Sequence, residues 1–239
     1  MLLRDDERGV ALVLAVMMMT LMLSLGSALV LLSSSETAIA ANFRASDEAF
    51  YAADTALQRT IAELQSALDW TTVLGGGIRS PFVDGDATGN RTLIDGSIIN
   101  LDQITNLANC EKETTCSDAE MAAGTTARPW GLNNPRWVPF AYGSLSDSLD
   151  TASVYSPFYV IAFVADDPSE NDDDPGQDGI AVDGQPNPGL GILVVRAEAF
   201  GPRRAHKVLE ATVRRAEIPS APGEPVSTEL HVLSWRDPR

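Results

Sequence analysis

An acidic segment holds the densest set of side chains that could do chemistry in this chain. Residues 166–179, DDPSENDDDPGQDG, carry seven carboxylates and no basic residue. Calcium binds six to eight oxygens from carboxylates, carbonyls and water. We expect Asp172, Asp174 and Asp178 to supply such ligands, with help from the backbone near Gly176. The spacing is not that of an EF-hand, and the alternative is a solvated acidic loop that keeps the surface soluble.

The two cysteines, Cys110 and Cys116, are separated by a spacing that matches neither a C-x-x-C motif nor a zinc pattern. In an oxidising compartment we expect them to form a small-loop disulfide, and in the cytosol they would be free thiols. Their state therefore depends on which side of a membrane this part of the chain lies.

Catalysis has little support in the sequence. His206 and His231 are the only histidines, and neither stands in a motif with a nucleophile and an acid. The sequence contains no P-loop and no G-x-G-x-x-G motif. The formal net charge of −16 repels phosphates, which argues against nucleic-acid binding. We predict that the chain is not an enzyme.

The elements that position the acidic segment are short strands that follow the glycines at 75–77. Residues 92–99 predict a hairpin with its turn at Asp95-Gly96. The apolar run at 158–164 predicts a central strand. Alternating apolar and polar residues at 191–200 and 207–215 predict two half-buried antiparallel strands. The acidic segment is then a loop between two strands.

The C-terminal part contains three prolines within residues 216–225, which predict an extended linker. Residues 228–235 follow it and are expected to add an edge strand.

The N-terminal part predicts one long helix. Residues 10–32 contain no charge and at 1.5 Å per residue span roughly 34 Å, enough for a bilayer core. A cleaved secretory signal has a shorter apolar core. Residues 33–68 contain no glycine or proline and continue the helix, with an apolar stripe for packing on the sheet. The stripe consists of Ile39, Phe43, Phe50, Leu57, Ile61, Leu64 and Leu68. Together these elements predict an α+β fold.

The residues before the apolar run, MLLRDDERG, resemble a class III (prepilin) leader. Three further stretches are similar to the N-terminal domain of PilX-type minor pilins: ERGVALV at 7–13, SETAIAANFRAS at 35–46 and AFYAADTAL at 49–57. The resemblance covers about the first 65 residues. Residues 191–215 are similar to the closing hairpin of such proteins.

The resemblance implies a pilin-like fold and a processing step. Prepilin peptidase would cut between Gly9 and Val10, and the new N-terminus at Val10 would be methylated. The apolar helix is retained, so other pilins and inner-membrane lipid are the expected partners. The chain would sit in the bacterial inner membrane with its globular domain in the periplasm, and later in an extracellular pilus or pseudopilus.

Leu14 departs from the pattern of major pilins, which usually carry a glutamate as the fifth mature residue. PilX-type pilins and the K-type pseudopilin of type II secretion often lack it. We therefore expect a minor subunit that primes assembly or lies near the tip, with a possible adhesive role. A major subunit that uses another contact is the alternative for this position.

These expectations divide the chain into five segments. They are a leader at 1–9, a transmembrane or filament-core helix at 10–32, its amphipathic continuation at 33–70, a globular α+β domain at 71–215, and a proline-rich linker with a C-terminal tail at 216–239. The predicted function is that of a PilX-like minor pilin in type IV pilus assembly. The rival hypothesis is a single-pass envelope protein with a periplasmic ligand-binding or calcium-dependent adhesive domain.

Overall fold

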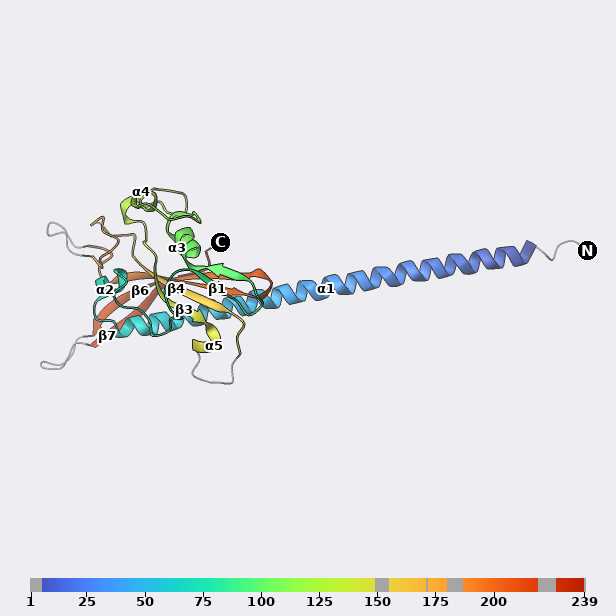
Figure 1. Ribbon diagram of the computed structural model, residues 1–239, viewed down its shortest axis with the longest axis horizontal. Helices are drawn as coiled ribbons and strands as arrows, with labels where there is room; N and C mark the ends of the chain where they lie inside the picture. Colours follow the sequence, from blue (N-terminus) through green and yellow to red (C-terminus); the bar gives the residue numbers. More distant parts are fainter. Residues whose placement is uncertain (1–5, 149–154, 171, 180–186, 219–226, 239) are drawn as a thin grey trace, which may run out of the picture. The chain divides into compact units, whose positions relative to one another are not determined.

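The structure is a computed structural model that describes residues 6–148, 155–170, 172–179, 187–218 and 227–238 (Figure 1). The chain forms two compact units, Met1–Arg44 and Ala45–Arg239. We describe each unit by itself.

The described part of the first unit is the N-terminal part of helix α1, which runs from Asp6 to Ser66. Its hydroxyl side chains donate back to helix carbonyls, as expected for polar residues within an apolar helix. Thr20 Oγ1 donates to the Met17 oxygen at 2.9 Å, and Ser24 Oγ donates to the Leu21 oxygen at 2.8 Å. These side chains therefore leave no unsatisfied polar group on the apolar surface.

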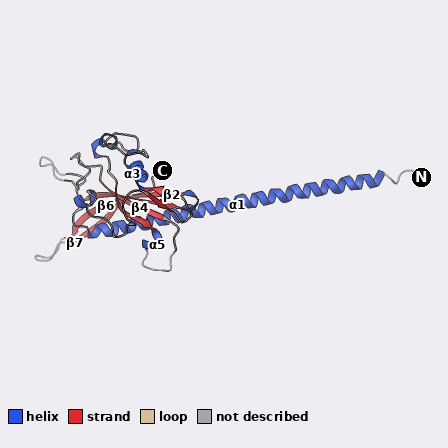
Figure 2. Cartoon of the chain, viewed as in Figure 1, coloured by secondary structure: helices blue, strands red, loops and turns tan. Residues whose placement is uncertain are grey.

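The second unit is built on a five-stranded antiparallel sheet with the order β3-β4-β5-β6-β7. Figure 2 shows the strands in red. The strands are β3 (Val138–Ser144), β4 (Tyr159–Asp166), β5 (Ile192–Gly201), β6 (Ala205–Ile218) and β7 (Ser227–Arg236). Every residue of β4 is buried, which confirms the interior strand predicted from its apolar run. The pairing of β5 with β6 is also confirmed, and the short helix η2 (Pro202–Arg204) joins them.

The C-terminal half of α1 packs on one face of the sheet. Small side chains make most of this contact, because Ala49, Ala52, Ala53 and Ala56 are all buried and let the helix approach closely. The predicted apolar stripe is correct only in part. Leu57 and Leu64 are buried and Phe50 and Ile61 are partly buried, whereas Ile39, Phe43 and Leu68 are exposed.

The opposite face of the sheet is also covered over β3, β4 and β5, so the prediction of a half-buried strand was wrong for β5, whose residues are mostly buried. It is confirmed for β6, where Leu209, Ala211 and Val213 are buried and most of the polar residues that alternate with them are not. A second apolar cluster joins Ile161 and Phe163 of β4 to Leu101 and Ile104 of helix α3 (Leu101–Cys110). The hairpin predicted at 92–99 is confirmed as β1 (Asn90–Thr92) paired with β2 (Ile98–Asn100). It leads directly into α3, whose first turn is capped by the Asn100 side chain.

The remaining elements are short: α2 (Trp70–Leu74), α4 (Asp118–Met121), η1 (Gly131–Asn133) and α5 (Leu145–Ser148). Helix α1 ends at Ser66, four residues before the boundary expected at 70, and Asp69 caps the separate helix α2. A disulfide joins Cys110, the last residue of α3, to Cys116, with a Cα–Cα distance of 6.0 Å.

The C-terminal segment forms part of the sheet. Strand β6 continues to Ile218, past the expected domain boundary at 215, and β7 supplies the predicted edge strand. The proline-rich residues 219–226 of the expected linker lie outside the described residues. The Trp235 ring on β7 contacts the Phe50 ring of α1 edge-on, with centroids 5.7 Å apart. The second unit therefore includes residues that the sequence assigned to a tail.

Candidate functional site

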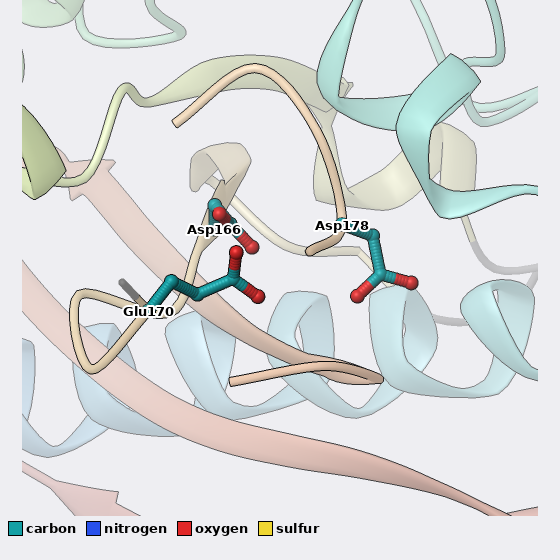
Figure 3. Close-up of side chains that lie close together, drawn as sticks. All are labelled: Asp166, Glu170 and Asp178. Atoms are coloured by element: carbon teal, nitrogen blue, oxygen red, sulfur yellow. The ribbon is translucent and has the colours of Figure 1, made fainter. Parts of the chain in front are cut away.

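Three carboxylates converge at the end of strand β4. We call Asp166, Glu170 and Asp178 the carboxylate cluster, because one oxygen of each lies within 4.8 Å of the others. Asp166 is the last residue of β4, and Glu170 and Asp178 come from the loop that follows it. Figure 3 shows the carboxylates of Asp166 and Glu170 facing each other, with that of Asp178 beside them.

Two members of the cluster are buried without a complete set of partners. Asp166 is 3% exposed and Glu170 is 5% exposed. Asp166 Oδ1 and Glu170 Oε1 are buried and accept no hydrogen bond. Burial and the charge of Glu170 raise the pKa of Asp166 to about 9, and burial, with the charge of Asp172, raises the pKa of Glu170 to about 7. The fold therefore disfavours the ionised form of both groups.

The surroundings hold Glu170 firmly in place. Asn187 Nδ2 donates to Glu170 Oε2 at 3.0 Å, and Asn133 Nδ2 donates to the Glu170 backbone oxygen at 2.6 Å. Gly179 and Gly189 lie so close to the Glu170 side chain that a Cβ on either glycine would collide with it. The backbone of both glycines thus forms the wall of the cluster.

Asp178 connects the cluster to two other elements. Its backbone N–H donates to Thr71 Oγ1 of α2 at 3.3 Å, and its Oδ1 accepts from the Gly191 N–H at 2.8 Å, just before β5. Burial raises the pKa of Asp178, although the bond from Gly191 and the charge of Arg215 oppose that rise. Arg215 itself donates to the carbonyls of Ala67 and Leu68.

The structure places the calcium ligands predicted from sequence differently. Asp178 belongs to the cluster, whereas Asp172 and Asp174 do not. Asp174 accepts from the Gly176 N–H at 3.1 Å and from Gln177, and Asp172 accepts from the Asp174 N–H at 3.2 Å. Asp174 uses its oxygens to shape the loop, whereas Asp172 also accepts from Asn187 Nδ2 at 3.5 Å and lies beside Glu170. Asp166 could have been found in the sequence as an acid that ends an apolar strand, whereas no local signal marks Glu170.

A second group of charged residues, with two buried acids at its centre, spans β5, β6 and β7. We call Arg196, Glu198, His206, Glu210 and Arg236 the charged ladder. Arg196 Nε lies 2.7 Å from Glu198 Oε1, and Arg196 Nη1 lies 3.0 Å from Glu210 Oε1. His206 Nε2 lies 2.8 Å from Glu198 Oε2, and Arg236 Nε donates to Glu210 Oε2 at 2.7 Å.

The ladder satisfies its buried acids. Burial alone would raise the pKa of Glu198, but the hydrogen bond with His206 and the charge of Arg196 outweigh it, and the pKa lies below its usual value. The other histidine, His231, is exposed and lies 4.0 Å from Glu229. Both histidines thus face acids rather than a nucleophile, an arrangement that fits a structural role.

The residues predicted for processing lie on helix α1. Gly9, Val10 and Leu14 are all helical and exposed. Every residue from 9 to 40 is exposed, although most of residues 10–32 are apolar. Among the described residues, one helix, Gly9–Ser66, is long and apolar enough to cross a membrane.

The comparisons with known proteins match this same helix. No curated protein and no solved structure matches the chain. The family model described as PilX N-terminal matches residues 8–58, which confirms the resemblance expected from the stretches at 7–13, 35–46 and 49–57. Residues 8–58 of this chain are therefore similar to the PilX N-terminal family.

Proposed function

We propose that the chain is a minor pilin of the PilX type, a structural subunit of a type IV pilus-like filament and not an enzyme. One observation carries the proposal: the family match at residues 8–58 coincides with a helix whose apolar side chains are all exposed between residues 10 and 32. Such a surface is stable only when lipid or other apolar helices cover it. A pilin helix meets both partners in turn, first the inner membrane and then the filament core.

The composition of the helix supports assembly with other helices. Met17, Met18 and Met19 are exposed side by side, and methionine adapts its shape to irregular partners. Leu14 brings no charge into the filament core, so it needs no partner amine there. A subunit without this charge lacks one contact that successive subunits would use as they add to the filament. We therefore propose a priming or tip-proximal position.

The proposed maturation begins at the leader, residues 1–9. Prepilin peptidase cuts after Gly9, and Val10 becomes the methylated N-terminus. Arg4 and Arg8 favour a cytoplasmic leader, which places the second unit in the periplasm. The Cys110–Cys116 disulfide supports this orientation, because disulfides persist in oxidising compartments.

Mass spectrometry of the N-terminus tests this maturation. The full chain is expressed in a bacterium that assembles type IV pili, and in the same strain without prepilin peptidase. We expect a chain that starts at methylated Val10 in the first strain and an intact leader in the second. Gly9→Val should block cleavage. The matched control is Gly26→Val, because Gly26 lies in the same helix and its added side chain also meets open space.

An intact leader in the strain with active peptidase would contradict the pilin assignment. That result would favour the rival hypothesis, a single-pass envelope protein with a periplasmic binding or adhesive domain.

A charge in the apolar helix tests the assembly step. Val16→Glu places a carboxylate within the uncharged stretch 10–32, where a charge costs up to about 2.5 to 3.5 kcal/mol on insertion. We expect this variant to leave the membrane fraction and to be missing from sheared filaments, whereas Val16→Leu behaves as the wild type. Filaments that contain Val16→Glu at the wild-type level would refute the proposal that this surface lies in the filament core.

A further inference from the structure

We propose that the carboxylate cluster, Asp166, Glu170 and Asp178, is a calcium site that fastens the loop after β4 to α2 and β5. The inference does not depend on the chain being a pilin. It replaces the ligand set expected from sequence with one that the fold brings together.

The geometry of the cluster suits a calcium ion. Calcium–oxygen distances of about 2.3 to 2.6 Å put opposite ligands about 5 Å apart. The three carboxylate oxygens, all within 4.8 Å of one another, fit inside such a sphere. Carboxylates are hard oxygen ligands, and a loop that supplies two of the three accepts the irregular geometry that calcium tolerates better than magnesium.

The burial of the oxygens is the second, independent observation. Asp166 Oδ1 and Glu170 Oε1 are both inaccessible to water and without a hydrogen bond. Only 3% of Asp166 and 5% of Glu170 remain exposed. Figure 3 shows these two carboxylates aimed at each other, where like charges repel unless a cation lies between them.

Protein cations do not fill this role within the described part of the chain. The described ion pairs of lysine, arginine and histidine include none with Asp166 or Glu170. Arg215 acts on Asp178, but its guanidinium donates to the carbonyls of Ala67 and Leu68 and stacks over Trp70, 4.0 Å from the ring centroid. Without metal a proton neutralises the pair, as the raised pKa values of Asp166 and Glu170 indicate, and an outside cation that displaces the proton is the other available counter-charge.

Calcium bound here would join the end of β4 and the loop after it to residues that touch α2 and β5. Asp166 ends β4, Glu170 is held by Asn133 and Asn187, and Asp178 reaches Thr71 of α2 and Gly191 beside β5. The ion would lower the free energy of this arrangement relative to the unfolded chain, where the three ligands are dispersed.

The test is calcium titration of the full chain in detergent micelles, after a chelator has stripped bound metal and has been removed. Isothermal titration calorimetry measures binding, and circular dichroism measures the thermal unfolding of the second unit. We expect one calcium per chain, a Kd below about 1 mM and a rise in Tm. Magnesium should bind at least about tenfold more weakly.

Two matched variants distinguish the carboxylate cluster from the calcium ligands predicted from the sequence. Asp166→Asn removes a cluster ligand and should weaken calcium binding at least about tenfold. Asp174→Asn removes an acid of the same segment that lies outside the cluster, and it should bind calcium as the wild type does. Glu170→Gln serves in place of Asp166→Asn if circular dichroism shows that the latter does not fold.

Three results would overturn the inference. The first is a folded wild type that gives no heat and no change in Tm at about 10 mM calcium. The second is binding that survives Asp166→Asn and is lost in Asp174→Asn. The third is magnesium binding as tight as calcium binding. A chain that keeps its leader yet binds calcium would contradict the proposed function and leave this inference standing.

Discussion

The charged ladder and the carboxylate cluster are two solutions to the same problem, acidic groups buried in one sheet. In the ladder, Glu198 contacts Arg196 and His206, and the pKa of Glu198 falls below its usual value. In the cluster, Asp166 and Glu170 contact other acids, and the pKa of each is raised. A buried carboxylate is stable when the fold supplies its counter-charge. The ladder supplies its own, whereas we infer that the cluster takes one from solution.

The largest effect should come from removing the shared cation of the ladder. Arg196→Met leaves Glu198 and Glu210 each with one partner fewer, and it should lower the free energy of unfolding by about 3 kcal/mol. Urea unfolding in detergent measures this loss. Arg214→Met is the control, because Arg214 is an exposed arginine on the neighbouring strand β6. If both variants lose the same free energy of unfolding, pairing with Arg196 is not what stabilises the buried Glu198 and Glu210.

A substitution in the carboxylate cluster should raise the free energy of unfolding when a chelator is present, whereas one in the charged ladder lowers it. Asp166→Asn removes a buried carboxyl that lacks partners, so we expect the free energy of unfolding to rise by about 1 kcal/mol. Added calcium should reverse the order, since it stabilises the wild type and not the variant. A variant that is less stable than the wild type in chelator would show that Asp166 is already satisfied.

The charged ladder should also affect how the free energy of unfolding falls at acidic pH. The pKa of Glu198 in the folded chain lies below its ordinary value of 4.5, so the unfolded chain binds the proton more tightly. The stability that Glu198 contributes is therefore present above about pH 4.5 and is lost as the pH falls through the lowered folded pKa. Glu198→Gln should flatten this limb in unfolding measurements from pH 6 to about pH 2. An unchanged slope would contradict the pairing.

The smallest effect should come from the half-exposed member of the ladder. His206→Phe keeps the stacking on Phe200, where the rings lie 4.5 Å apart, and removes the hydrogen bond with Glu198. We expect a loss of less than about 1 kcal/mol, because Arg196 still pairs with Glu198 and solvent screens the exposed ring. His231→Phe, at an exposed pair, should cost nothing measurable. A loss as large as that of Arg196→Met would make His206 the main partner.

The contrast between these regions also shows what the sequence could predict. Local patterns located β4, the β5–β6 pair and the β1–β2 hairpin, because apolar runs, alternation and a turn motif act over a few neighbouring residues. The exposure of Ile39 and Phe43 was missed, because periodicity defines a helix face without saying how far along the helix the sheet reaches. The burial of the second sheet face was missed for a similar reason, since α3 arrives from a segment with no distinctive pattern.

The cluster shows the same limit at the level of a site. The acidic segment drew attention to calcium, but charge density alone could not separate Asp172 and Asp174, which bond within the loop, from Glu170. What brings Glu170 towards Asp166 and Asp178 is its contact with Asn133 and Asn187, residues 37 and 17 positions away. Such long-range contacts are set by the tertiary fold and leave no local signal.

The disulfide between Cys110 and Cys116 has a use outside the fold itself. A pair that closes only six positions apart forms as soon as α3 reaches an oxidising compartment, and it stays reduced in the cytosol. If the second unit is exported as proposed, the fraction of oxidised chains, read from thiol labelling in intact cells, reports the share of subunits whose second unit has reached an oxidising compartment. This readout needs no antibody or tag.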